Sequence, residues 1–143
     1  MVYFNIISYN WLMKNKSIQI KRSSLPPRLV NENENGIRIK VYIQGHMIGA
    51  GKMELFHLVA EKGSIRSAAK AMGMSTKRAT LLLKTIEEAF PQPILEKQTG
   101  NQGTKITSFG KELLQKYLDL CEHLTIESKE FVNWAASKQS LKL

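Results

Sequence analysis

Strict alternation of apolar and polar residues marks the first regular element of the chain. Between residues 37 and 44 every second position is apolar, at Ile37, Ile39, Val41 and Ile43. A period of two residues predicts one strand with a buried face and an exposed face. The glycine-rich stretch 45–51 that follows is expected to be a link to the first helix.

Beyond this link the apolar period lengthens to three and four residues, which is typical of helices with one buried face. The pattern predicts a first helix over Met53–Ala60, which ends at Gly63. A second helix, over about 65–72, begins behind the capping residue Ser64, and a third, over about 76–89, begins behind Ser75. The buried stripe of the third helix is expected to consist of Ala79, Leu83, Ile86 and Phe90.

The connection between the second and third helices is short and contains Gly73, a residue that tolerates positive φ. The small side chains of Ala68 and Ala69 allow another helix to approach the second helix closely. Two helices joined in this way form a helix-turn-helix motif. An ordinary helical hairpin uses the same small residues, so the spacing alone leaves that alternative open.

A short hairpin is predicted after the third helix. The segment Pro91-Gln92-Pro93 stops the helix, because proline has no backbone N–H to donate. Two strand candidates, 94–97 and 105–107, are joined by the polar turn 98–104, which contains two glycines and no acidic residue. Such a turn can lie against a phosphate backbone, as the wing of a winged helix does. A hairpin that faces only solvent is the alternative.

A long helix is predicted over Phe109–Ala136, with Ser108 as its cap. One apolar stripe, Leu114, Leu118 and Cys121, can dock on the domain. A second stripe follows heptad spacing and consists of Leu113, Tyr117, Leu120, Leu124 and Phe131. The second stripe has no evident partner in so small a chain, so we expect it to form a homodimer interface. A helix fully packed on its own domain is the competing interpretation.

Together these elements predict a mainly α fold with a small β wing, namely a winged helix-turn-helix with a long C-terminal dimerisation helix. The expected organisation is an N-terminal extension and linker over 1–36, the winged helix-turn-helix domain over 37–108 and the long helix over 109–143. The apolar residues at the start of the extension are interrupted by polar ones before they reach the length of a membrane span, so we expect no membrane association.

Charge adds one distinctive feature to this picture. The 143 residues include 21 Lys and Arg against 12 Asp and Glu, a net charge of +9. Residues 1–30 hold five basic residues and no acidic one, and residues 61–111 hold nine basic against four acidic residues. Residues 112–143, with four against five, are nearly neutral. The excess of positive charge predicts a polyanionic partner, with nucleic acid as the first candidate and a membrane surface as the second. The nearly neutral segment 112–143 suits contact with protein.

The third helix of a winged helix-turn-helix enters the major groove of double-stranded DNA. The outward and N-terminal positions of this helix are Ser75, Thr76, Lys77, Arg78, Thr80, Leu81 and Lys84. We expect Arg78 to bind guanine, with a contact to the DNA backbone as the alternative because Arg78 adjoins Ala79. Leu81 is expected to meet a base edge, and the lysines are expected to contact phosphates. Further contacts with the DNA backbone are expected from Arg66 in the second helix and from the wing residues Asn101, Gln102 and Lys105.

No catalytic arrangement is predicted. The pair Gly51-Lys52 is followed by Met53, whereas a phosphate-binding loop requires Ser or Thr there to hold magnesium. The three histidines, His46, His57 and His123, lack the spacing of metal ligands, and the single cysteine, Cys121, lies on an apolar stripe. We therefore expect neither an enzyme nor a bound cofactor, metal or small-molecule ligand.

Several segments, in this order and at this spacing, carry a resemblance to a known family: Gly49–Lys52, Glu61–Ile65, Ala68-Ala69, Met72–Ser75, Thr99–Gly103 and Ile106–Lys111. The stretch from Ile37 to Leu124 resembles the DNA-binding domain of the molybdate-responsive (ModE-type) regulators and, more distantly, the winged helix of LysR-type regulators. The resemblance implies a sequence-specific DNA-binding transcriptional regulator. We expect it to act as a homodimer in the cytoplasm, associated with the nucleoid.

The sequence departs from this family in two respects. Full-length members carry C-terminal oxyanion-binding domains, whereas this sequence ends at Leu143, so we expect molybdate binding in the family manner to be absent. The wing also contains fewer glycines than the usual loop of the family. An alternative function is a protein-interaction adaptor, in which the same fold turns its positive face toward an acidic protein in a regulatory complex.

Overall fold

The computed structural model describes residues 35–100 and 103–139. The elements in these ranges are β1 (Lys40–Ile43), β2 (His46–Gly49), α2 (Ala50–Lys62), α3 (Ile65–Ala71), α4 (Thr76–Glu87), β3 (Leu95–Lys97), β4 (Thr104–Ile106), α5 (Ser108–Glu127) and α6 (Lys129–Gln139). Both sheets are two-stranded. The predicted mainly α fold with a small β wing is confirmed, and the extension before residue 35 lies outside the described residues.

The first strand belongs to a hairpin, so the predicted link over 45–51 is wrong. β1 pairs antiparallel with β2, from Lys40 opposite Gly49 to Ile43 opposite His46. The two residues of the turn, Gln44 and Gly45, both have positive φ, 50° and 82°. This combination is what a tight two-residue hairpin turn requires. The glycines therefore mark the turn and the end of β2, and α2 begins directly afterwards at Ala50.

Three helices pack around one apolar core. α2 supplies the largest share of it, with Met53, Leu55, Phe56 and Val59 wholly buried. α2 packs against both α3 and α4, and these two pack against each other. Ala68 and Ala69 of α3 are buried, and Gly73 in the turn before α4 has φ 65°, as the predicted helix-turn-helix requires.

The start of α5 is fixed to the segment that follows α4. Thr107, rather than the predicted Ser108, caps the helix, because its hydroxyl oxygen accepts a hydrogen bond of 2.9 Å from the N–H of Gly110. The same hydroxyl donates to the carbonyl of Pro93 (2.7 Å). Gly110 is buried so closely that a Cβ there would lie 2.5 Å from the carbonyl oxygen of Ile94. The core therefore continues from the helix-turn-helix into the first half of α5.

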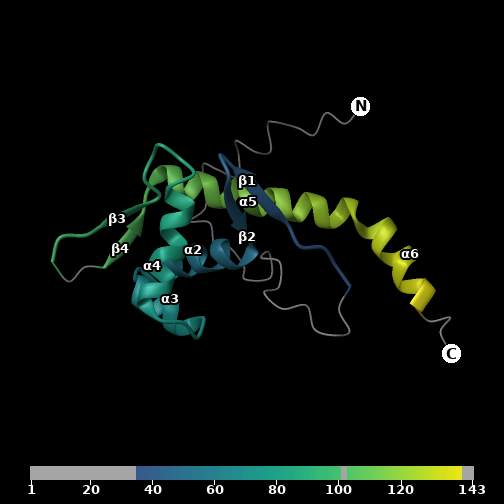
Figure 1. Cartoon of the computed structure of the whole chain (residues 1–143), viewed down its shortest axis with the longest axis horizontal. Coiled ribbons are helices and arrows are strands. Elements are labelled where there is room, and N and C mark those ends of the chain that lie inside the picture. The colour runs from purple at the N-terminus through teal and green to yellow at the C-terminus, as the bar shows by residue number, and fades with distance from the viewer. Residues whose placement is uncertain (1–34, 101–102, 140–143) are drawn as a thin grey trace, which may run out of the picture.

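The C-terminal segment is two helices, which corrects the prediction of one helix over 109–136. α5 ends at Glu127 and α6 begins at Lys129, with Ser128 between them. The hydroxyl of Ser128 donates to the carbonyl of Thr125 (3.0 Å), and that of Thr125 donates to the carbonyl of Cys121 (2.7 Å). Hydroxyls that bond to the preceding turn bend helices. The axis therefore changes direction at this point (Figure 1).

The wing and α6 lie at opposite ends of the molecule (Figure 1). The hairpin of β3 and β4 projects from one end, beside the cluster of α2, α3 and α4, whereas α6 extends from the other end, at an angle to α5. Leu114, Leu118 and Cys121 of α5 are buried in the core, as predicted for the docking stripe. No residue of α6 is buried.

Candidate nucleic-acid interface

The N-terminus of α4 is capped by the side chain of Ser75. Ser75 accepts a hydrogen bond of 3.2 Å from the N–H of Arg78 through its hydroxyl oxygen, as a capping serine does. On the inner side of the helix Ala79, Leu83 and Ile86 are buried, as predicted. Phe90 lies beyond the end of the helix, where it is half-buried and its ring meets that of Phe109 edge-on at 5.3 Å. The inner stripe therefore fixes the side of α4 that faces solvent.

The opposite side of α4 is fully accessible. Every outward position singled out from the sequence is exposed, namely Ser75, Thr76, Lys77, Arg78, Thr80, Leu81 and Lys84. Leu81, at 57% exposure, is the large apolar side chain of this face. The hydroxyl of Thr80 donates to the carbonyl of Thr76 (2.9 Å), so this hydroxyl is already engaged within the helix. The surface thus combines cations, a hydroxyl and apolar groups, which is the mixture that reads base edges and phosphates.

The wing is anchored to the helix-turn-helix by one short backbone contact. The N–H of Thr104, at the start of β4, donates to the carbonyl of Gly63 at the C-terminus of α2 (2.8 Å). Gly103 has φ 86°, and a Cβ at this position would lie 2.3 Å from the same carbonyl oxygen. Only glycine allows this approach. This contact of residues 103 and 104 with Gly63 has no signal in the sequence pattern, and it fixes the start of β4 to the C-terminus of α2.

Of the four other residues predicted to contact DNA, two lie among the described residues and two lie outside them. Arg66 on α3 and Lys105 on β4 are both exposed. β3 and β4 pair as predicted for the wing, with Glu96 opposite Lys105. Asn101 and Gln102 lie outside the described residues, so their predicted role stays a prediction.

The residues predicted for a dimer interface separate into two groups. Tyr117 is 5% exposed and its hydroxyl donates to the carbonyl of Ile39 (3.5 Å), so it packs inside its own chain, and Leu113 packs partly against the same core. Leu120 and Phe131 are exposed, and Leu124 is half-buried. Trp134 was missed by the heptad pattern. Its ring centre lies 5.9 Å from that of Phe131, and spacing by three residues on a helix was the available signal.

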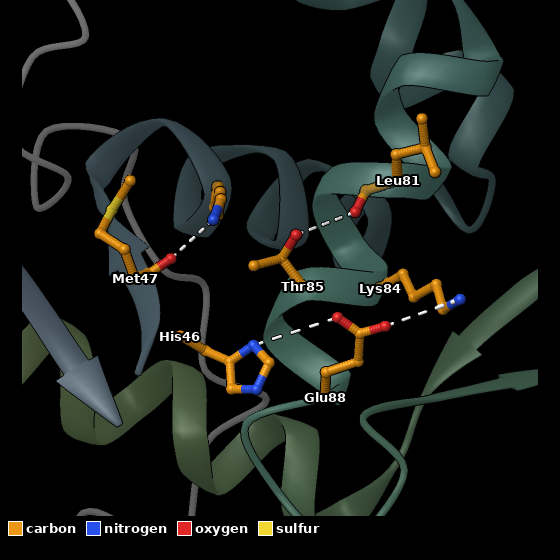
Figure 2. A network of polar contacts seen from close by, with 7 residues as sticks. His46, Met47, Leu81, Lys84, Thr85 and Glu88 are labelled. Carbon is orange, nitrogen blue, oxygen red and sulfur yellow. Dashed lines mark hydrogen bonds and ion pairs between the residues drawn. The ribbon is translucent and has the colours of Figure 1, made fainter. Parts of the chain in front are cut away.

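One polar cluster near α4 brings together residues that lie far apart in the sequence. Glu88, directly after α4, has Oε1 at 3.6 Å from Nζ of Lys84 and Oε2 at 4.0 Å from Nδ1 of His46 (Figure 2). His46 is the first residue of β2. The backbone carbonyl of the next residue, Met47, accepts a hydrogen bond from Nζ of Lys52 in α2 (2.7 Å). The pairing of β1 with β2 was not predicted, and so this cluster was not predicted either.

Several features of the described residues bear on chemistry other than DNA binding. Among them, no group of three or more His, Cys, Asp or Glu side chains is placed to hold a metal ion. Within the same ranges, no helix combines the length and apolar character that a membrane crossing requires. Burial raises the pKa of the Cys121 thiol, which keeps it protonated and poorly nucleophilic. Burial likewise raises the pKa of the Tyr117 phenol.

Two comparisons of sequence agree with this geometry. Residues 51–111 match the family described as bacterial regulatory helix-turn-helix protein, lysR family. The transcriptional regulator ModE of Haemophilus influenzae (strain ATCC 51907 / DSM 11121 / KW20 / Rd) is 35% identical over 82 residues, which cover 55% of this chain and 32% of ModE. The chain thus spans about a third of the length of that relative.

Solved structures with a similar arrangement include the CbnR_DBD-DNA complex, with a TM-score of 0.49 at 24% identity over 60% of this chain and 95% of that one. Another is VV2_1132, a LysR family transcriptional regulator, with a TM-score of 0.49 at 19% identity over 65% of this chain and 30% of that one. The sequence matches carry the assignment. Residues 51–111 are therefore similar to the helix-turn-helix of LysR-type regulators, and the sequence of the chain is similar to that of ModE.

Proposed function

We propose that the chain is a sequence-specific transcriptional regulator that binds double-stranded DNA as a homodimer, in the cytoplasm at the nucleoid, without enzymatic activity of its own. One observation carries this proposal: the whole outward row of α4, from Thr76 to Lys84, is exposed above a fully buried inner stripe. A major groove admits one α-helix, and this row provides hydrogen-bonding, cationic and apolar groups to read it.

The assignment of roles follows from side-chain chemistry. Arg78 has a planar guanidinium that can form two bonds to guanine, so we assign it to sequence readout. Lys77 and Lys84 are point charges on flexible stems and suit phosphates of any sequence. Arg66 on α3 and Lys105 on β4, which are both exposed, add contacts with the DNA backbone. The similarity to ModE, a transcriptional regulator, supports the same function.

The homodimer is supported by the C-terminal helices. Leu120, Phe131 and Trp134 are exposed apolar side chains, and α6 has no buried residue within its own chain. Aromatic side chains of this kind are enriched where proteins meet. A symmetric dimer would present two copies of α4 to two half-sites that lie about one or two helical turns apart on a roughly palindromic operator.

The proposal is tested by selecting fragments from a random duplex library with the full chain and measuring their affinity against salt concentration. We expect one enriched, roughly palindromic motif. A dimer that neutralises about 6–10 phosphates should lose roughly 10³–10⁵ in affinity between about 50 and 200 mM salt. Recovery of no motif, with salt-insensitive binding, would overturn the proposal and favour the adaptor alternative, in which the positive face meets an acidic protein.

A further inference from the structure

We propose that Glu88 is a positioning residue for DNA binding: it holds the ammonium group of Lys84 and thereby limits how strongly α4 binds the phosphate backbone. The inference rests on the proposed function, because it concerns the same face of α4. It comes from the cluster of Figure 2.

The geometry places one carboxylate between two basic side chains. Lys84 lies one helical turn before Glu88 on the exposed side of α4, and its Nζ is 3.6 Å from Oε1. Nδ1 of His46, in the hairpin of β1 and β2, is 4.0 Å from Oε2. The side chains of Lys84 and Glu88 remain 66% and 47% exposed. The pair is therefore accessible to a phosphate that approaches α4.

The physical consequence is a competition for one cation. A lysine that faces a carboxylate is already partly neutralised, so it gains less when it meets a phosphate. The carboxylate also repels the phosphate directly. An exposed pair of this type is weak, and DNA is able to displace it. Glu88 therefore reduces the affinity by a modest factor, and it does so for every DNA sequence alike, because phosphates carry no sequence information.

Other charged groups near the cluster do not replace Glu88 in this role. Nζ of Lys52 on α2 is bonded to the carbonyl of Met47. Lys40 on β1 stands opposite Gly49, at the far end of the hairpin from His46. Glu87, the neighbouring carboxylate, is turned by about 100° around the helix from Glu88 and makes no ion pair within 4.0 Å that the described residues reveal. Glu87 therefore provides a matched control of identical charge.

The test measures the affinity of the full chain for the selected duplex and for an unrelated duplex by fluorescence anisotropy, as a function of salt. We expect Glu88→Gln to bind both duplexes about three-fold more tightly at about 50 mM salt, with a steeper salt dependence. Glu87→Gln should produce a clearly smaller gain. In the background of Lys84→Ala the gain from Glu88→Gln should shrink to the small part that comes from direct repulsion of the phosphate, since Glu88 acts mainly through Lys84.

The outcomes separate this inference from the proposed function. An unchanged affinity of Glu88→Gln, or an equal gain with and without Lys84, overturns the role of Glu88 while the wild-type chain still selects its motif. A wild-type chain that selects no motif and binds neither duplex overturns both. Because Glu88 is exposed and glutamine keeps its shape, we expect the thermal unfolding of this variant to match that of the wild type.

Discussion

The outward faces of α4 and α6 are both exposed, yet they are built for different partners. α4 buries Ala79, Leu83 and Ile86 in the core and exposes hydroxyls and cations, with Leu81 as its large exposed apolar residue. α6 buries none of its residues and exposes two aromatic rings, Phe131 at 68% and Trp134 at 58%. The charge follows the same division, with +5 over residues 61–111 and −1 over residues 112–143.

This difference shows how a small chain separates two tasks. A helix whose inner face is fixed by the core presents its outer side chains in a defined order, which reading of base edges requires. A helix without intrachain packing gains its stability from what covers it, because most helix stability in proteins comes from packing of an apolar face. The first arrangement suits a rigid polyanion, and the second suits an apolar protein surface.

The largest expected effect lies at α6. Replacement of Phe131 and Trp134 together by alanine should raise the dissociation constant of the dimer by at least about 1000-fold, since each aromatic anchor at the centre of an interface contributes about 2 kcal/mol or more. Because α6 buries nothing in its own chain, the core should remain intact. Sedimentation equilibrium measures the assembly, and circular dichroism checks the fold.

The exposed residue Asn133 lies between the two aromatic positions and serves as the control. Asn133→Ala should leave the dissociation constant almost unchanged. If the double variant and the wild type dimerise with the same dissociation constant, the aromatic face of α6 is not the dimer interface. The proposed division of tasks between α4 and α6 would then be wrong for α6.

A smaller effect is expected for single side chains of α4. Arg78→Ala should cost about 1–3 kcal/mol of binding free energy for the selected duplex and reduce the preference over an unrelated duplex. Lys84→Ala should weaken binding to both duplexes alike, because its contact is with phosphates. Competition titrations distinguish the two patterns. A loss of preference in Lys84→Ala rather than in Arg78→Ala would reverse the assigned roles.

The smallest effect concerns the anchor of the wing. Gly103 and Gly100 both have positive φ, but only Gly103 would bring a Cβ within 4 Å of other atoms, at the carbonyl of Gly63. Gly100→Ala should therefore cost only the conformational penalty, about 1 kcal/mol. Gly103→Ala should cost roughly 1 kcal/mol more, because the contact with Gly63 must open. Chemical denaturation of both variants measures the difference, and equal losses would mean that the wing is not held at this point.

Much of the anchored half of the molecule could be predicted from the sequence. Ser64 and Ser75 were predicted as the caps of α3 and α4, and each accepts a hydrogen bond from the backbone N–H three residues later. The spacing of Ala79, Leu83 and Ile86 identified the inner side of α4, so the outward row could be named. These features are local, and local chemistry is what a sequence pattern contains.

The errors arose where distant segments decide the structure. β2 is short and lies among glycines, so its pairing with β1 was missed, and the cluster of His46 with Glu88 was missed with it. Tyr117 fits the heptad stripe that was predicted for the dimer interface, but it is buried in its own chain, where its hydroxyl donates to the carbonyl of Ile39. The bend at Ser128 depends on hydroxyls that bond to carbonyls of the preceding turn, which hydrophobic spacing does not register.

The claim that the outward face of α4 binds DNA is tested most directly by adding one negative charge there and one elsewhere. Thr80 on α4 is compared with Gln139 at the end of α6, because both are exposed and neither belongs to the aromatic face of α6. The affinity of Thr80→Glu and Gln139→Glu for the selected duplex is measured by fluorescence anisotropy. We predict a loss of at least about 30-fold for Thr80→Glu and almost none for Gln139→Glu. Equal affinities of the two variants would contradict the account.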